Sequence, residues 1–145
     1  MISTKGRYAL RVMIDLAEQQ GDEYIPLKEI ARRQSISKKY SESIVRALVK
    51  AKLIKGSSGK GGGYKLCRTP DEYPIGTILE ATEGRYFSVA CLAEDAGACP
   101  RAQQCRTQTM WAQFDRMVHD FFYHKTLGDL IRQDDGQGTS AAPGA

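Results

Sequence analysis

The N-terminal third of the chain carries an apolar pattern of helical period in three stretches. After Ser3 and Thr4, two residue types that cap helices, apolar residues recur at spacings of three and four as far as Gly21. A second stretch begins at Pro26, and a third follows Ser37, another capping residue. We therefore expect three amphipathic helices. The residues expected on their inner faces are Tyr8, Ala9, Val12, Met13, Leu16, Ala17, Leu27, Ile30, Ala31, Tyr40, Ile44, Ala47, Leu48 and Ala51.

Residues 53–66 change to a short alternating pattern around a glycine-rich turn. Two such segments flank Gly59-Lys60-Gly61-Gly62-Gly63, which predicts a β-hairpin, and glycine permits the positive φ angles of a tight turn. A phosphate-binding P-loop is disfavoured, because its GxxxxGK motif is absent and no helical pattern follows. Since a short break at residues 35–37 separates the second and third helices, we interpret this region as a helix-turn-helix followed by a wing that lies on DNA.

The second half of the chain predicts a short helix, a loop and a long helix. Apolar residues over 75–83 end at Gly84, and helical spacing resumes from about Cys105. The long helix carries more aromatic surface than an isolated helix leaves in water. It either packs against a second copy, which its length favours, or folds back on its own domain. Its apolar residues are Met110, Trp111, Phe114, Met117, Val118, Phe121 and Phe122.

These patterns predict a mainly α protein with a small β-hairpin wing. A length of 145 residues fits one small domain with an added oligomerisation element. We expect a winged helix-turn-helix over residues 1–84 and a cysteine-containing loop over 85–104. A dimerisation helix and a short terminal helix follow over 105–132, and a polar tail over 133–145 is expected to be disordered.

Charge is distributed unevenly between the two halves. Residues 1–66 hold 14 Lys and Arg against 6 Asp and Glu, whereas residues 67–145 hold 7 against 11. A basic N-terminal half favours double-stranded DNA as the partner, although a merely solvated basic surface has the same composition. With no apolar run of about 20 residues and no signal-peptide core, we expect a cytoplasmic protein.

The third helix supplies the side chains expected to contact DNA. Lysine and serine can reach phosphates or bases, and Glu42 can accept a hydrogen bond from a cytosine amino group, unless it is only a surface charge. The expected DNA-binding residues are Ser37, Lys38, Lys39, Tyr40, Ser41, Glu42 and Arg46, with Ser58 and Lys60 on the wing.

Three of the four cysteines, Cys91, Cys99 and Cys105, lie in an Ala- and Gly-rich segment that has little hydrophobic pattern. In a reducing cytosol such thiols indicate metal or redox chemistry more than disulfides. Their spacing lacks the CxxC pairs of common zinc sites, so an iron–sulfur cluster, zinc, a thiol switch and no special role all stay open. A thiol oxidoreductase is disfavoured, because no CxxC motif and no cysteine beside a histidine is present.

Several of these motifs together resemble the Rrf2 family of regulators, of the IscR, NsrR and CymR type. They are Thr4-Lys5-Gly6-Arg7-Tyr8-Ala9-Leu10, Leu27-Lys28-Glu29-Ile30-Ala31, Gly61-Gly62-Gly63-Tyr64, the three loop cysteines and Thr126-Leu127-Gly128-Asp129-Leu130. The resemblance covers residues 1–132 and implies a homodimeric, non-enzymatic transcription factor that binds a palindromic operator. It also implies an iron–sulfur cluster on Cys91, Cys99 and Cys105 that controls DNA affinity, of the 2Fe–2S type in preference to 4Fe–4S.

The fourth cluster ligand is the main departure from that pattern. IscR has a histidine three residues after its last cysteine, where this chain has Gln108. Some NsrR relatives use a carboxylate of the first helix, where this chain has Arg7, which cannot ligate a metal. Cys67 is expected to pack as a small hydrophobe. The two histidines, His119 and His124, are expected at the surface or in an interface.

The wing departs from the pattern as well. Relatives carry an arginine ahead of the wing glycines that enters the minor groove, and here that position is Ser58, for which Lys60 is a substitute. Two other functions remain open. The protein could be a cluster-free regulator of the same fold, controlled by a partner protein or by cysteine oxidation. It could also be a zinc-stabilised DNA-binding module.

Overall fold

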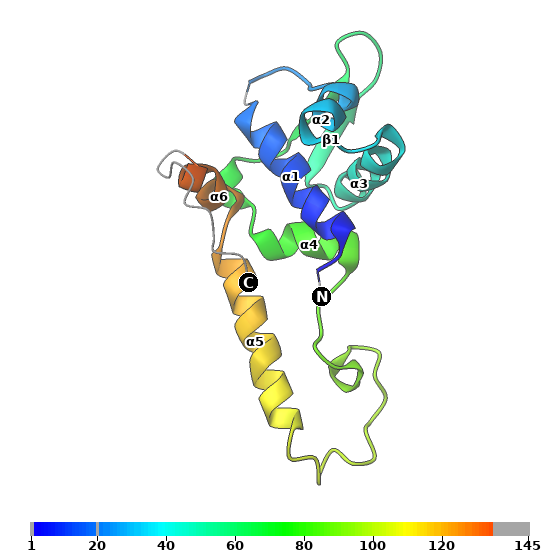
Figure 1. Ribbon diagram of the computed structural model, residues 1–145, viewed down its shortest axis with the longest axis vertical. Coiled ribbons are helices and arrows are strands. Elements are labelled where there is room, and N and C mark those ends of the chain that lie inside the picture. The colour runs from blue at the N-terminus through cyan, green and yellow to red at the C-terminus, as the bar shows by residue number, and fades with distance from the viewer. Residues whose placement is uncertain (1, 20, 135–145) are drawn as a thin grey trace.

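A computed structural model describes residues 2–19 and 21–134, and this part of the chain forms six α-helices and one small antiparallel sheet (Figure 1). This confirms a mainly α fold with a β-hairpin wing. The predicted tail falls largely on residues 135–145, which lie outside the described part. The helices are α1 (Thr4–Glu18), α2 (Leu27–Gln34), α3 (Lys38–Lys50), α4 (Ile75–Glu83), α5 (Gln108–His124) and α6 (Leu127–Asp134); the strands are β1 (Ile54–Ser57) and β2 (Gly63–Leu66); and two short 3-10 turns are η1 (Pro70–Glu72) and η2 (Ala90–Leu92).

Local caps set the start of the N-terminal helices. The Ser3 hydroxyl accepts a hydrogen bond from the backbone N–H of Gly6, and the Ser37 hydroxyl accepts one from Tyr40, so α1 and α3 begin where their capping residues predict. Between α2 and α3, Ser35 adopts a left-handed conformation with φ of 53° and ends α2. The helix-turn-helix therefore has a short, defined turn.

Helix α1 lies at the centre of the core and packs against α2, α3, α4 and α6. Small and medium side chains on its inner face, such as Ala9 and Met13, are fully buried and allow these helices to approach closely. The buried apolar side chains of the core are Ala9, Val12, Met13, Leu16, Ala17, Ile30, Ala31, Ile36, Ile44, Val45, Leu48, Leu53, Ile54, Tyr73, Ile75, Ile78, Leu79 and Leu127.

The buried face of α3 differs from the predicted one. Val45 is buried, whereas Ala47 is half-buried and Ala51 is exposed because the helix ends at Lys50. Ser41 is also fully buried, and its hydroxyl donates to the backbone oxygens of Ser37 and Lys38, at 3.0 and 2.9 Å. This corrects the predicted placement of Ser41 on the outer face of the helix. A serine can take this core position because its own helix satisfies its hydroxyl.

One buried carboxylate joins α1 to the end of α2. Asp15 is 2% exposed, and its oxygens accept hydrogen bonds from Arg33 Nη2 at 2.8 Å, from Arg33 Nε at 2.9 Å and from Gln34 Nε2 at 3.0 Å. The bidentate pair and the amide satisfy both oxygens, which a buried charge requires. The carboxyl group of Asp15 also raises the pKa of the Arg33 guanidinium. This contact holds the first helix of the helix-turn-helix against the core.

The wing is an antiparallel hairpin in which Ile54 pairs with Leu66 and Ser57 pairs with Gly63. Ile25 and Tyr64 exchange two backbone hydrogen bonds of 2.8 Å, which attach the wing to the segment that precedes α2. Gly63 has a φ of +152°, and a Cβ atom there would clash with the backbone of Ile25. Only glycine permits this close approach.

Residues 84–107 leave this body after α4 and extend away from the helix-turn-helix, and α5 then returns to the body, so that its C-terminal end lies beside α6 (Figure 1). Its C-terminal end is held by backbone bonds, from Ile75 N–H to Lys125 O and from Leu127 N–H to Tyr73 O, both 2.9 Å long. No helix in residues 2–19 and 21–134 is long and apolar enough to cross a membrane.

We expect Asp15→Ala to lower the free energy of unfolding by about 2 kcal/mol, because it leaves Arg33 and Gln34 without their acceptor. Urea unfolding at one fixed protein concentration measures the change. The control is Glu29→Ala, which removes the exposed partner of Arg33 at 3.5 Å and should change the free energy by less than about 0.5 kcal/mol. Equal effects from the two variants would contradict a dominant role for the buried carboxylate.

Candidate DNA interface and cysteine loop

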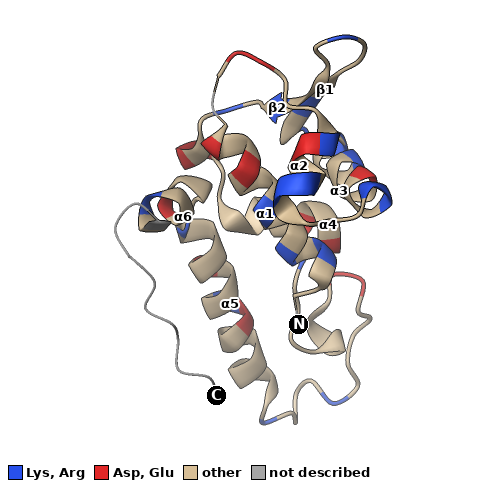
Figure 2. Ribbon diagram, turned by 45° about the horizontal axis from the view of Figure 1, so that its top comes forward, with Lys and Arg blue, Asp and Glu red and all other residues tan. Residues whose placement is uncertain are grey.

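The start of α3 presents a cluster of exposed charged side chains. Lys38, Lys39, Glu42 and Arg46 are all exposed, and they lie on the face of the helix that is turned away from the core. Figure 2 shows cationic residues on α2 and α3 and at the tip of the wing. Such a face can place lysine and arginine against phosphates and base edges, and it leaves Glu42 free to accept a hydrogen bond from a base.

Three residues of the predicted set have a structural role in α3. Ser37 is exposed but its hydroxyl caps the helix, and Ser41 faces the core as described above. The ring of Tyr40 is half-buried and packs edge-on against Tyr8 of α1, with ring centroids 5.7 Å apart. The guanidinium group of Arg11 lies over the ring of Tyr8, 4.9 Å from its centroid. Tyr40 therefore helps to fix α3 on α1, a role that its place in the apolar pattern already indicated.

The wing tip presents Ser58 and Lys60, and both are exposed. Gly59 and Gly61, on either side of Lys60, have φ angles of +85° and +76°, which the turn requires and which other residues rarely adopt. At the base of the wing, Lys65 lies 4.7 Å over the ring of Tyr24. The exposed cations Lys28 and Arg32 of α2 extend the basic surface. Lys28 and Arg32 lie outside the apolar stripe of α2, and this position in the sequence pattern already indicated that they would be exposed.

The three loop cysteines lie on the segment between α4 and α5. Cys91 is in η2 and exposed, Cys99 is half-buried, and Cys105 is exposed just before α5. Within the described ranges, no group of three or more His, Cys, Asp or Glu side chains is placed to hold a metal ion. The structure therefore puts the three thiols on one loop without bringing them together around a common centre.

A hydrogen bond attaches this loop to α5, and an ion pair lies within the loop itself. The Ser88 backbone N–H donates to Asp115 Oδ1 at 2.9 Å, and Arg85 forms an ion pair with Glu94 within the loop. Most of the loop is exposed or half-buried, and η2 has no buried residue. With so little apolar burial, the cysteine segment can change its path at small cost to the core.

Cys105 has the most distinct environment of the three thiols. Its Sγ lies 3.5 Å from the Thr107 hydroxyl, and the backbone N–H groups of Thr107 and Gln108 also point toward it. The Thr107 hydroxyl and then these N–H groups lower the pKa of the Cys105 thiol. Thr107 is the N-cap of α5, so the thiol lies at the start of that helix. A lowered pKa favours thiolate, the form that binds metals and reacts with oxidants.

The candidate fourth ligands lie on different elements. Gln108 is the first residue of α5 and half-buried, and it is three residues from Cys105. Arg7 is exposed and donates to the Thr4 hydroxyl at 3.2 Å. His119 is exposed and stacks on Tyr123 at 4.4 Å, and His124 is exposed at the C-terminal end of α5, as expected for surface histidines.

Cys67 directly follows β2, far along the chain from the loop thiols, and it is exposed. The prediction that Cys67 packs as a small hydrophobe is therefore wrong. The neighbouring side chain in the core is that of Tyr73, which is fully buried. Its hydroxyl accepts a hydrogen bond from the backbone N–H of Cys67 at 2.8 Å. The thiol side chain is left on the outside.

The order of a helix, a helix-turn-helix and a hairpin wing defines a winged helix-turn-helix protein of the DNA-binding class. The model of the Rrf2 family, described as iron-dependent transcriptional regulators, matches residues 2–133. The chain belongs to the Rrf2 family, as its motifs predicted.

Relatives of known sequence support this assignment. The chain is 34% identical to the Rrf2 protein of Nitratidesulfovibrio vulgaris over 131 residues, which are 90% of this chain and 87% of that one. It is 33% identical to the IscR regulator of Vibrio campbellii over 134 residues, 92% and 79% of the two chains. Both cover the wing, the cysteine loop and α5.

Solved structures match the fold. The global cysteine regulator CymR of B. subtilis superposes with a TM-score of 0.72 and 34% identity, covering 92% of this chain and 97% of that one. IscR of T. potens superposes with a TM-score of 0.73 and 27% identity, covering 97% and 93%. The protein is thus a transcriptional regulator with no enzymatic role.

We expect Lys60→Ala to weaken binding to all DNA sequences and to lower the slope of log affinity against log salt by about one, because one phosphate contact is lost. Fluorescence anisotropy over a salt series measures both quantities. Arg106→Ala, at an exposed position just before α5 and outside the winged domain, removes the same charge and should leave the slope unchanged. An unaltered slope in Lys60→Ala would show that this lysine is not on the phosphates.

Proposed function

We propose that the protein is a homodimeric transcriptional regulator whose affinity for a palindromic operator depends on the state of Cys91, Cys99 and Cys105. The observation that carries this proposal is the position of the cysteine segment. It connects α4 of the winged domain to the first turn of α5, so a change in its path acts on both. A DNA partner also means that the protein acts in the cytoplasm.

Iron–sulfur chemistry is the best match to these donors. Cysteine thiolates are the usual cluster ligands, and a cluster supplies reversible electron transfer and sensitivity to oxygen or nitric oxide. Cys91, Cys99 and Cys105 would hold it, and the carbonyl oxygen of Gln108 is the proposed fourth donor because Gln108 stands at the position of the histidine in IscR. A 2Fe–2S cluster is the proposed type. Because the described geometry keeps the thiols apart, the loop must rearrange to bring them together.

A second copy of the chain is the proposed cover for the outer face of α5. Four large apolar residues on this helix are exposed: Met110 by 51%, Phe114 by 43%, Met117 by 65% and Phe121 by 61%. Their spacing of four, three and four residues puts them on a single stripe, as in helices that pair along their length. The inner face of α5 packs against α4, so this outer stripe is free for a partner.

Pairing through α5 would set the distance between the two recognition helices. Each α3 must meet a half-site, and half-sites lie about one turn of DNA apart, roughly 34 Å. When Cys105 and the other two thiols are drawn together, the segment before Thr107 shortens and the first turn of α5 must follow. A change of about 1–3 kcal/mol in operator binding is typical of such coupling.

Direct oxidation of the thiols is the second candidate for control. It is favoured by the exposure of Cys105 and by the hydrogen bonds that lower the pKa of its thiol. The chain is also similar to CymR of Staphylococcus aureus, whose structure was solved in an oxidized form, with a TM-score of 0.68 and 33% identity. A zinc ion on the same thiols is a third candidate, and metal analysis separates it from the other two.

We expect anaerobically purified protein to contain iron and sulfide and to absorb in the visible range. Single Cys→Ala changes at positions 91, 99 and 105 should abolish the absorption and change operator affinity by about five- to 150-fold, the range that 1–3 kcal/mol represents. Cys67→Ala is the matched control, since Cys67 directly follows β2 and is far along the chain from the loop, so this variant should keep the spectrum.

Each alternative gives a different result in the same experiment. Colourless protein with one zinc per chain would support the zinc module. Colourless, metal-free protein whose DNA affinity responds to peroxide only when Cys105 is present would support thiol oxidation. Wild-type affinity in all three loop variants would contradict any sensing role for these cysteines.

We expect Met117→Glu to weaken the dimer at least about tenfold, because it places a charge from each copy in the apolar contact. Sedimentation velocity over a concentration series measures the dissociation constant. Thr109→Glu adds the same charge at an exposed position on α5 outside the stripe and should sediment as the wild type does. A Met117→Glu protein that sediments like wild type would contradict pairing through this face.

A further inference from the structure

The hydroxyl group of Tyr73 is buried at the base of the wing, a position that the sequence around Tyr73 does not predict. Tyr73 lies between η1 and α4 and is fully buried. Its Oη donates to the Leu53 backbone oxygen at 2.7 Å and accepts from the backbone N–H groups of Cys67 at 2.8 Å and Arg68 at 3.0 Å. One donor and two acceptor positions are all that a phenol offers, so the group is fully satisfied.

These partners are the two ends of the wing. Leu53 directly precedes β1, and Cys67 directly follows β2. The hydroxyl therefore bridges the two strands at the base of the hairpin, where they leave and re-enter the core. Burial raises the pKa of the Tyr73 hydroxyl, so it keeps the proton that it donates to Leu53.

The backbone of the same residue holds the end of α5. Tyr73 O accepts from the Leu127 N–H at 2.9 Å, and Ile75 N–H donates to Lys125 O at the same distance. Between them Pro74 and Thr126 form an antiparallel bridge. Tyr73 thus bonds through its side chain to the wing and through its main chain to the segment that joins α5 to α6.

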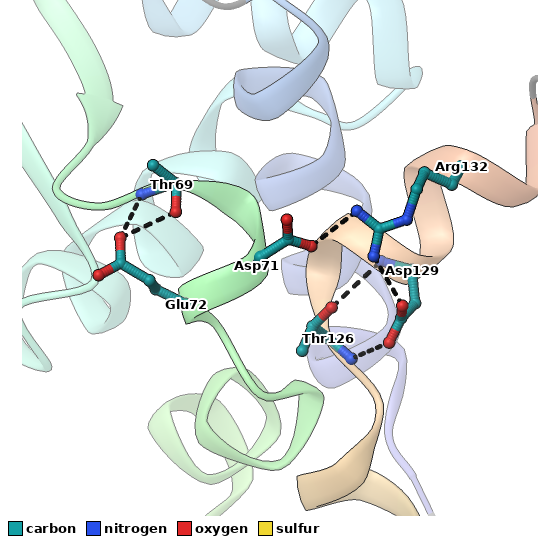
Figure 3. A network of polar contacts seen from close by, with 6 residues as sticks. All are labelled: Thr69, Asp71, Glu72, Thr126, Asp129 and Arg132. Atoms are coloured by element: carbon teal, nitrogen blue, oxygen red, sulfur yellow. Dashed lines mark hydrogen bonds and ion pairs between the residues drawn. The ribbon is translucent and has the colours of Figure 1, made fainter.

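Polar contacts on the surface also connect η1, which precedes Tyr73, to α6 (Figure 3). Arg132 of α6 donates to Asp71 of η1 at 2.7 Å and to Asp129 at 2.8 Å. Thr126 and Asp129 cap the start of α6 reciprocally, and Leu127 between them is fully buried. The η1 turn and the start of α6 are therefore held as one unit, with Tyr73 at its inner side.

We propose that Tyr73 is a positioning residue that couples the wing to the C-terminal end of α5. A displacement of α5 in the dimer is passed to residues 125–127, to the main chain at Tyr73 and then to both ends of the hairpin. The wing then changes its approach to DNA together with the spacing of the recognition helices. This inference rests on the proposed function, in which α5 is the dimerisation helix.

The wing has a second attachment, which gives the coupling a direction. Ile25 and Tyr64 fix the middle of β2 to the segment before α2. With that point held and the base moved by Tyr73, the hairpin is expected to tilt, which carries the turn around Lys60 toward or away from the DNA backbone. A wing attached only at its base would move as a whole.

The test is Tyr73→Phe, which removes one oxygen atom and retains the buried ring. The DNA is a duplex of about 30 base pairs selected by the wild-type protein from a random pool, long enough for two half-sites. The change removes all three hydrogen bonds of the hydroxyl at the base of the wing. We expect an unchanged dimer and an affinity for this duplex lowered about fivefold, which corresponds to about 1 kcal/mol of binding free energy. Amide hydrogen exchange is expected to rise over residues 54–68 and to stay unchanged in α1 and α3.

The matched control is Tyr123→Phe. Tyr123 is half-buried on α5, where its ring stacks on His119 and its hydroxyl lies near Glu80 and Thr77 of α4. It should keep wild-type DNA affinity and wild-type exchange in the wing. If Tyr73→Phe does not fold, Arg132→Ala at an exposed position loosens α6 from η1 and is expected to raise exchange over residues 54–68 as well.

The outcomes separate this inference from the proposed function. A wild-type protein that selects no duplex would overturn the DNA-binding role itself. If the wild type binds and Tyr73→Phe keeps its affinity and its wing exchange, only the role of Tyr73 is overturned. Exchange that rises equally in all helices would indicate a general loss of stability, and it would also overturn the positioning role.

Discussion

The structure depends on the burial of α1 on most of its sides. Because α2, α3, α4 and α6 all pack against this helix, its small inner residues set the distances between them. Asp15 adds a buried charged contact to that interface and holds the end of α2 through Arg33. With the inner face of α3 committed to the core, its cations have no position except the outside. The DNA-facing surface is therefore a consequence of how the core is filled.

Helix α5 differs from α1, because a large part of its apolar surface is exposed. It is held at its C-terminal end by hydrogen bonds to residues 73 and 75, and its outer apolar stripe is exposed. Its N-terminal end begins at Thr107, directly after the exposed cysteine segment. The proposed sensor segment lies at the N-terminal end of α5, and the wing lies beyond its C-terminal end, on the far side of the body (Figure 1). A helix of 17 residues is stiff enough to carry a displacement between them.

Most of the helices and the wing could be predicted from local sequence signals, and the residues that were wrongly placed share one cause. Ser3 and Ser37 cap the helices that they were expected to cap, and Gly63 permits the close approach of the wing. Ser41 and Cys67 were misplaced, because a polar residue in a helix and a thiol after a strand can each face either way. Which way they face depends on neighbours from other parts of the chain.

The amino-acid sequence by itself determined the helices, the hairpin, the basic half and the family, because periodicity, caps and motif spacing are properties of neighbouring residues. Only the tertiary structure decided that Asp15 pairs with Arg33 and that Tyr73 joins the wing to α5. Those contacts link residues 18, 20 and 54 positions apart, and no local pattern specifies them. The three cysteines are intermediate, because their spacing suggests a common centre while the path of an exposed loop decides whether they meet.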